Sequence, residues 1–459
     1  MRFASTVVRL LVFILPLGMT SVQGEELTEE IVSEMAGKLV EDNVVDGLSV
    51  GFLQGDRYGT YHFGRTSRSG RQPNNLTVYE LGSISKLFTS LLVADAVVQG
   101  KIKLTDTIEA DNKAGIKLPS YQGTGISWLD VCVHRSGLPR LPGDYQPASM
   151  NDPYRNYNSN EASKFLARHQ LARQPGETQE YSNFAVSVLG YMIAELNHSD
   201  YETLLRDRIA KPLRMDDCTV TLSDAQKKRF ARPHHPVGKG VQVWNFADLP
   251  GAGGIRSTLK DMMRFAKATI DPPDGPVGEA IELAWKQHSP ADQSGSAMGL
   301  GWMIHPDGMT RWHNGETGGS HSIIVVNREL KVAVIVLANT APGDTVDQLA
   351  MELVARTVPS HSPRDQPTEP DPSDANLERL VGRYQLAPTF VFDVSVQGDR
   401  VMVGITNQPT QEVFSDSPTM WSYRGVDAKL EFHFRGKGPA YALTLHQNGI
   451  KQKAKRIRD

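Results

Sequence analysis

The chain has 459 residues, of which 39% are hydrophobic, with a formal net charge of −3 and an isoelectric point near 6.5. This length suits one large domain with a smaller one, and the apolar content is enough for a sizeable core. Because there is neither a basic excess nor a dense block of Lys and Arg, the composition argues against nucleic acid as a partner.

The cysteine content limits the redox and metal chemistry. Only Cys132 and Cys218 are present, which excludes a disulfide scaffold and a cysteine-rich metal site. Cys132 lies in an apolar, helix-like pattern, so we expect two small buried thiols. Pairing of the two in an oxidising compartment is the alternative.

Residues 1–24 have the pattern of a secretory signal peptide. Arg2 and Arg9 stand at the front, an apolar run covers residues 10–17, and small residues lie around Val22–Gly24. The run is too short to cross a bilayer comfortably, and an uncleaved anchor is the alternative. No other segment is long and apolar enough to span a membrane. We therefore expect an exported mature protein, periplasmic or secreted, without a membrane span.

The pattern of residues 25–358 indicates an α+β domain. Both ends of this segment contain a helix and a β-hairpin. The expected elements are a helix at 27–40, strands at 48–54 and 58–63, strands at 322–327 and 331–338, and a closing helix at 346–358. The middle is rich in helical patterns, which favours an antiparallel sheet flanked by its terminal helices, with a helical region inserted.

The last part of the chain has a different composition. Residues 359–375 are mostly Pro, Ser, Asp, Glu and Arg and indicate an extended linker. In residues 376–459, short alternating segments separated by turn residues predict a small all-β barrel or sandwich. Its expected strands are 390–396, 400–405, 412–414, 429–434 and 441–446.

Ser83–Lys86 places a hydroxyl and an amine one helical turn apart at the start of an expected helix. Residues three apart lie on the same helix face, so Lys86 can remove the Ser83 proton and make a nucleophile without a histidine. Gly82 lets the backbone turn tightly into this helix, and apolar residues after Lys86 bury it. A free lysine has a pKa of ~10.4 whereas a base needs ~7–8, so burial and a neighbouring cation are required.

A second Ser-x-x-Lys occurs at Ser257–Lys260, so the spacing alone does not identify the nucleophile. Here the serine is followed by Thr, Leu, Lys and Asp, which is typical of a helix cap. We therefore predict that Ser83 is the nucleophile and that the second match begins a helix.

Two segments offer a tyrosine and an asparagine at the same spacing. Tyr181-Ser182-Asn183 precedes a helical run, and its phenol can share proton transfer with a lysine. An ordinary capped helix start is the alternative. Tyr154-Arg155-Asn156 lies in a polar stretch without apolar periodicity, which indicates a surface loop.

A glycine-containing segment, His313–Gly319, leads into the strand expected at 322–327. A strand that begins with glycine can bring its backbone N–H groups up to a substrate carbonyl. The N–H groups of Glu316 and Ser83 can then form an oxyanion hole, in which each donor typically contributes ~3–4 kcal/mol. A purely structural histidine is the alternative for His313.

Together these segments resemble the class C serine β-lactamases and the related penicillin-binding DD-peptidases and esterases. Ser-x-x-Lys is a signature of the wider group, and class C and its relatives use Tyr-x-Asn at the second place. The resemblance covers roughly residues 30–357 and extends through Tyr79–Lys86, His134–Pro139 and Gly253-Gly254. Only Ser83 precedes both other motifs, which rejects Ser257.

The resemblance implies the transpeptidase-like (DD-peptidase/β-lactamase) fold, with a five-stranded antiparallel sheet, helices on both sides and a helical subdomain facing the site across a cleft. It implies that Ser83 is acylated, that Lys86 and Tyr181 exchange its proton, and that Asn183 binds a substrate amide. The family needs no metal or organic cofactor. The C-terminal β domain resembles small domains appended to exported members.

The His313–Gly319 segment, which is the third motif after Ser-x-x-Lys and Tyr-x-Asn, bears on which substrate is expected. The resemblance assigns His313, Gly315 and Glu316 to substrate binding, with the backbone of Glu316 and Ser83 holding the oxyanion. Class C β-lactamases have a lysine in place of His313, directed at a substrate carboxylate, and a histidine is mostly neutral near pH 7. β-Lactams and D-Ala peptides are therefore expected substrates, with esters or D-amino-acid peptides as the alternative. A sensor that binds peptidoglycan or penicillin without turnover is a second alternative.

Overall fold

The computed structural model divides the chain into two compact units. The larger contains Glu26–Thr357, and the smaller contains Val358–His446 and Lys451–Asp459. The structure describes residues 24–109, 113–147, 149–235, 241–292, 295–358, 377–387, 390–398, 400–406, 410–415, 417–423, 428–436, 438–447 and 450–457.

An antiparallel sheet in the order β2-β1-β9-β8-β7-β6-β5 is the framework of the larger unit. Its five long strands are β1 (Gly47–Gln54), β2 (Arg57–Gly64), β7 (Thr310–Glu316), β8 (His321–Asn327) and β9 (Val332–Ala338). Two short strands, β5 (Ala297–Met298) and β6 (Met303–Ile304), extend the expected five. Because β1 pairs with β9, the two hairpins from opposite ends of the unit form one sheet.

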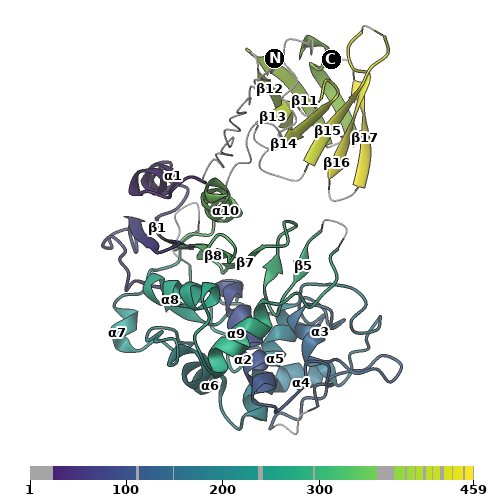
Figure 1. Ribbon diagram of the computed structural model, residues 1–459. Coiled ribbons are helices and arrows are strands. Elements are labelled where there is room, and N and C mark those ends of the chain that lie inside the picture. Colours follow the sequence, from purple (N-terminus) through teal and green to yellow (C-terminus); the bar gives the residue numbers. More distant parts are fainter. Residues whose placement is uncertain are drawn as a thin grey trace, which may run out of the picture. The chain divides into compact units, whose positions relative to one another are not determined.

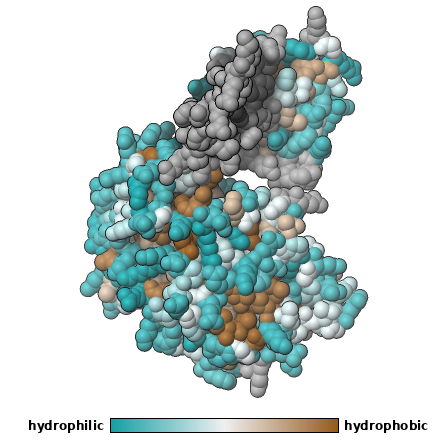
Figure 2. All heavy atoms as spheres, in the orientation of Figure 1, coloured by the Kyte–Doolittle hydropathy of each residue, from teal (hydrophilic) through white to brown (hydrophobic). Residues whose placement is uncertain are grey.

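Helices cover both faces of this sheet (Figure 1). Ala333, Ile335 and Leu337 of β9 pack on the side of helix α8 (Leu259–Ile270), whereas its alternate valines pack on the side of α1 (Glu29–Glu41) and α10 (Thr345–Thr357). Burial on both faces explains why β9 is an unbroken apolar run. Figure 2 shows mostly hydrophilic side chains on the visible face of this unit, with apolar side chains in patches.

The inserted region is built around helix α2 (Ser85–Val98), in which every residue from Ser85 to Ala96 is buried. A helix that is buried all round has no polar face to keep in water. A two-stranded sheet of β3 (Val78–Glu80) and β4 (Arg256–Thr258) lies at the start of this region. The other helices are α3 (Trp128–Cys132), α4 (Ser159–Leu166), α5 (Asn183–Leu196), α6 (Tyr201–Leu205), α7 (Asp224–Lys227) and α9 (Pro276–Trp285).

The smaller unit contains a closed barrel with its strands in sequence order, β10 to β17. Closure leaves no open edge, because Arg383–Gln385 of the first strand pairs with the last strand. Aromatic and aliphatic side chains fill the barrel. Its strands are β10 (Gly382–Ala387), β11 (Phe390–Gln397), β12 (Arg400–Ile405), β13 (Gln411–Ser415), β14 (Met420–Tyr423), β15 (Ala428–His433), β16 (Ala442–Gln447) and β17 (Ile450–Ile457).

The fold class expected from the sequence is confirmed, together with both hairpins and both terminal helices of the larger unit. Three barrel strands were missed. Among residues 451–457 of β17, whose burial is described, only Ala454 is buried, and lysines and arginines surround it, so the strand lacks an apolar pattern. The expected signal peptide (residues 1–24, apart from Gly24) and linker (residues 359–375) lie outside the described residues and remain predictions.

Cys132 and Cys218 are both buried and unpaired, as expected of small buried thiols. Burial raises the pKa of the Cys132 thiol to about 12, which keeps it protonated and unreactive. Within the part of the chain that the structure describes, no helix combines the length and the apolar character needed to cross a membrane.

Candidate active site

Ser83 lies in a tight 3-10 turn, Gly82–Ile84, between strand β3 and helix α2. Gly82 has a φ of +50°, and a Cβ at this position would lie 2.7 Å from the backbone nitrogen of Glu316. Only glycine accepts both the conformation and the close approach. The turn continues directly into α2 and brings Lys86 Nζ to 2.9 Å from Ser83 Oγ. The two groups of the expected pair therefore meet in space.

Lys86 is almost completely enclosed, with 1% of its surface exposed. Burial lowers the pKa of its amine well below the ordinary value of about 10.5, and the charge of Arg140 lowers it further. The amine also donates to the carbonyl of Ala252 at 2.8 Å. A neutral Lys86 can thus keep one donor bond while its lone pair accepts the proton of Ser83.

Tyr181 immediately precedes helix α5 and hydrogen-bonds the side chain of Ser83. Burial raises the pKa of its phenol to about 12, so Tyr181 is protonated at neutral pH. Lys86 Nζ lies 4.8 Å from the centroid of the Tyr181 ring. Ser83 therefore has a neutral amine and a protonated phenol as its neighbours.

His134 supports Tyr181, a role that the sequence pattern did not reveal. The two ring centroids are 4.3 Å apart, and His134 Nδ1 accepts a hydrogen bond from the Ser182 backbone at 3.3 Å. Its φ of +56° is uncommon for a residue other than glycine. Burial lowers the pKa of His134 well below its ordinary value. A neutral imidazole therefore fixes the entry into α5.

Strand β7 approaches the turn that carries Ser83. A Cβ on Gly315 would lie 2.7 Å from the Ser83 nitrogen and closer still to the Leu81 carbonyl. The same carbonyl accepts a hydrogen bond from Ser322 Oγ of β8 at 2.7 Å, which holds the sheet against the turn. The backbone of Ser83 therefore adjoins that of Glu316, as the oxyanion-hole prediction requires.

Glu80 is a buried acid that sequence reasoning missed. Its carboxylate accepts hydrogen bonds from the Trp244 backbone at 3.0 Å, Thr317 Oγ1 at 2.9 Å and Ser320 Oγ at 3.1 Å. Burial raises the pKa of this carboxyl group. Because Thr317 and Ser320 form the turn after β7, Glu80 fixes that turn to the strand preceding Ser83.

His313 is fully buried, and its Nδ1 lies 2.5 Å from the carbonyl oxygen of Asn314. Burial lowers its pKa to about 3. The bond to Asn314 places the hydrogen on Nδ1, and Nε2 has no hydrogen-bond partner among the described residues. His313 is thus a neutral imidazole with a free acceptor and no permanent positive charge.

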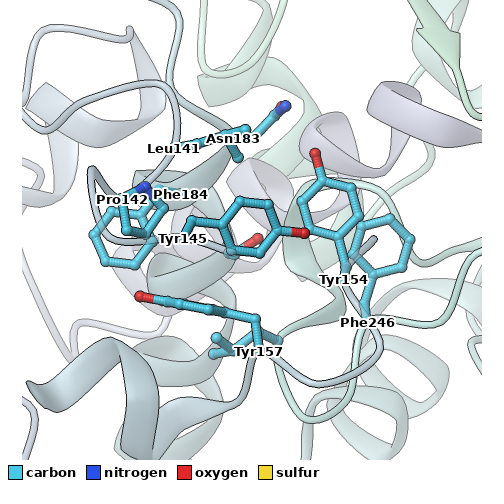
Figure 3. A pocket seen from close by; sticks show the side chains of 10 residues that line it. Leu141, Pro142, Tyr145, Tyr154, Tyr157, Asn183, Phe184 and Phe246 are labelled. Atoms are coloured by element: carbon cyan, nitrogen blue, oxygen red, sulfur yellow. The ribbon is translucent and has the colours of Figure 1, made fainter. Parts of the chain in front are cut away.

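Asn183, the first residue of α5, lies at a small aromatic pocket of about 20 Å³, which has room for about one water molecule (Figure 3). Its side chain hydrogen-bonds Tyr154, whose ring stacks on Phe246 at 4.8 Å and on Tyr145 at 5.9 Å between centroids. The predicted surface loop is confirmed, because residues 154–156 form a turn in which Arg155 and Asn156 are exposed, although these stacking contacts leave Tyr154 half-buried. The remaining lining residues are Leu141, Pro142, Tyr157, Phe184, Ser187 and Leu249.

The second Ser-x-x-Lys match does not form a pair. Ser257 lies in β4, and the cap of α8 is Thr258, whose hydroxyl accepts from the Asp261 backbone at 3.2 Å. Lys260 is exposed. The predicted helix start is confirmed, with the cap one residue later than the serine, and Lys260 lacks the burial that a lysine base requires.

His321 forms a charged cluster next to the end of β7. Its Nε2 lies 2.8 Å from Asp347 Oδ1, and its Nδ1 lies 3.2 Å from Glu316 Oε2. Burial disfavours the charged ring, but the two carboxylates outweigh it and raise the pKa to about 9. In the described part of the chain, no group of His, Cys, Asp and Glu side chains is arranged to hold a metal ion.

A sheet covered by helices on both faces, with a serine and a lysine paired at the start of a buried helix, defines a serine hydrolase of the β-lactamase/DD-peptidase fold. The chain belongs to the β-lactamase family, whose model, described as Beta-lactamase, matches residues 32–358.

Relatives in this family include enzymes of two kinds. A beta-lactamase of Escherichia coli (strain K12) is 25% identical over 311 residues, which cover 66% of this chain and 77% of the relative. The D-alanyl-D-alanine-carboxypeptidase/endopeptidase AmpH of the same organism is 29% identical over 245 residues, covering 52% of this chain and 61% of AmpH.

Two solved structures share the fold. The octameric penicillin-binding protein homologue from Pyrococcus abyssi has a TM-score of 0.64 at 21% identity, covering 94% of this chain and 100% of that chain. The beta-lactamase/D-alanine carboxypeptidase from Pseudomonas syringae has a TM-score of 0.63 at 20% identity, covering 73% and 99%. At these identities the likeness concerns the fold alone.

The raised pKa of His321 predicts a pH-dependent contribution to stability. The folded pKa is about 9 and the ordinary value is 6.5, so the contribution is complete below pH 6.5 and disappears as pH rises through 9. We expect His321→Gln to lower the free energy of unfolding by at most about 3 kcal/mol at the acidic end of this window. Urea unfolding of both proteins at several pH values measures this. A difference that does not shrink towards pH 9 would contradict the assignment.

Proposed function

We propose that this chain is an exported serine hydrolase of the class C β-lactamase type, which forms an acyl-enzyme on Ser83 and cleaves amide bonds of β-lactams or D-Ala peptides. The observation that carries the proposal is the 2.9 Å separation of Lys86 Nζ and Ser83 Oγ in a buried setting. Export rests on the signal-peptide pattern of residues 1–24.

The proposed reaction begins with proton transfer from Ser83 to the neutral amine of Lys86 while Ser83 Oγ attacks the carbonyl carbon. The carbonyl oxygen becomes an oxyanion held by the backbone N–H groups of Ser83 and Glu316. Its collapse breaks the bond to the leaving group, which takes a proton from Tyr181 as Lys86 reprotonates the phenol. Tyr181 suits this step because its raised pKa keeps it protonated.

Water then completes the cycle. Lys86, neutral again after passing on its proton, removes a proton from a water molecule that attacks the acyl carbon. The second tetrahedral intermediate expels Ser83 Oγ, which recovers its proton from Lys86. Asn183, at the start of α5, is suited to hydrogen-bond a substrate amide through its side chain.

Ester or D-amino-acid peptide hydrolysis is a second candidate, and the state of His313 favours it. A buried imidazole with a pKa of about 3 supplies no permanent positive charge at the third motif. Recognition of a carboxylate by that residue is therefore weaker than by a lysine. The similarity to a beta-lactamase and to the carboxypeptidase AmpH is consistent with both candidates.

Covalent labelling tests the nucleophile directly. We expect a fluorescent penicillin or a fluorophosphonate to add to the purified protein and Ser83→Ala to abolish labelling, with Ser257→Ala as the matched control that still labels. Intact mass spectrometry identifies the adduct and follows its release. Undiminished labelling of Ser83→Ala would refute the proposed mechanism. A penicillin adduct that never leaves would instead favour a sensor without turnover.

The proposed oxyanion hole predicts a strong effect of a single methyl group. Gly315→Ala would push β7 away from Ser83, so we expect kcat/KM for a chromogenic ester to fall by about 10²–10³. Gly143→Ala is the matched control, because no atom lies within 4 Å of a Cβ there. Circular dichroism verifies that both variants are folded. Activity equal to that of the parent in folded Gly315→Ala would contradict the assignment of the oxyanion hole.

A further inference from the structure

Arg140 is a cation that lies beside Tyr181 at the candidate active site. Its guanidinium carbon lies 5.2 Å from the centroid of the Tyr181 ring. The backbone of Arg140 is fixed, because its carbonyl accepts a hydrogen bond from the Phe184 backbone at 3.2 Å in the first turn of α5. The side chain itself is exposed. Arg140 therefore stands on the same rim of the site as Tyr181.

The positive charge of Arg140 affects the pKa values of groups in the site. It contributes to lowering the pKa of Lys86, after the larger effect of burial, and it also acts on Tyr181 and Tyr154. An arginine keeps its charge at every pH at which proteins are folded. His313, by contrast, is neutral. The permanent positive charge near the nucleophile thus comes from Arg140 rather than from the third motif.

In the described part of the chain, no carboxylate forms an ion pair with Arg140. Other arginines of the helical region have acidic partners, such as Arg173 with Glu180 and Arg168 with Asp144. Among the residues that the structure describes, no Asp or Glu oxygen lies within ion-pair distance of Arg140. Its guanidinium lies over an aromatic ring, which restricts its motion, and within the described ranges its N–H groups make no hydrogen bond.

Arg140 lies beside Tyr181 and directly precedes two residues of the aromatic pocket. Leu141 and Pro142, the next two residues, line that pocket beside Tyr154 and Asn183 (Figure 3). A substrate whose carbonyl lies at Ser83 and whose adjacent group extends towards the mouth of this pocket must pass this rim. An anionic group a few atoms from the scissile bond would come within reach of the guanidinium.

We propose that Arg140 binds a carboxylate of the substrate, so that the preferred substrates are acyl compounds with a carboxylate near the scissile bond. This rests on the proposed function of Ser83. A planar guanidinium can donate two parallel N–H bonds to one carboxylate, which makes it a selective partner. Arg140 thereby supplies the recognition that His313 does not.

Matched phenyl esters test this proposal. In one pair, N-acetylglycine is esterified with 3-carboxyphenol or 3-carbamoylphenol. In the other pair, the acyl side differs: the phenyl ester of N-succinylglycine carries a carboxylate, and the phenyl ester of N-succinamoylglycine carries a neutral carboxamide in its place. The readout is the ratio of kcat/KM for the charged ester over the neutral one. A general effect of Arg140 on the pKa of Lys86 cancels in this ratio.

We expect the parent protein to prefer the charged ester in at least one pair and Arg140→Met to lower that ratio about tenfold or more, with Arg140→Lys in between. Arg155→Met is the matched control, an exposed arginine that is not among the charges acting on Lys86 or Tyr181. Its ratio should equal that of the parent.

The outcomes separate the two proposals. If the esters are hydrolysed with a dependence on Ser83 but Arg140→Met leaves the ratio of both pairs unchanged, the role of Arg140 is refuted and the proposed function stands. If the parent hydrolyses none of the four esters, the role of Arg140 is refuted, and covalent labelling of Ser83 decides the proposed function separately. A melting temperature measured for each variant excludes unfolding as the cause of a changed ratio.

Discussion

The burial of Lys86 beside Ser83 is the constraint on which the rest of the site depends. A buried ammonium loses its hydration, so the neutral amine is favoured, and only a neutral amine can take the proton of a serine. Helix α2 provides both proximity and burial. The spacing of three residues brings the amine to Ser83, and the residues around α2 enclose the Lys86 side chain. The carbonyl of Ala252 accepts one hydrogen bond, so the amine is not left unsatisfied.

The other groups of the site are fixed by contacts between segments far apart in the sequence. Gly82 and Gly315 let strand β7 approach the 3-10 turn that carries Ser83. Glu80 holds the second turn, which follows β7, through hydrogen bonds. On the other side, helix α5 positions Tyr181. The sheet and the helical region must therefore assemble together before the site exists. The neutral His313 and the charged Arg140 then give the two sides of the site different electrostatic character.

Much of the fold and the pairing of Ser83 with Lys86 could be predicted from the sequence because they depend on local patterns. The β9 strand is a continuous apolar run, and Ser83 and Lys86 are one helical turn apart. The contributions of Glu80 and Arg140 could not be predicted, because each depends on partners more than 40 residues away and neither has a distinctive local pattern. The barrel strand β17 was missed because its outward lysines and arginines give it no apolar pattern. Pairing with β10, rather than apolar content, stabilises this strand.

The central claim, that burial makes Lys86 the base for Ser83, is tested most directly by the pH dependence of acylation. The rate constant for reaction of Ser83 with a fluorophosphonate, measured by stopped flow from acidic to alkaline pH, reports the ionisation of the base in the free enzyme. A lowered pKa predicts that the rate rises with pH and reaches its plateau well below 10.5, the ordinary value for a lysine. A rate that still climbs through pH 10.5 would contradict it.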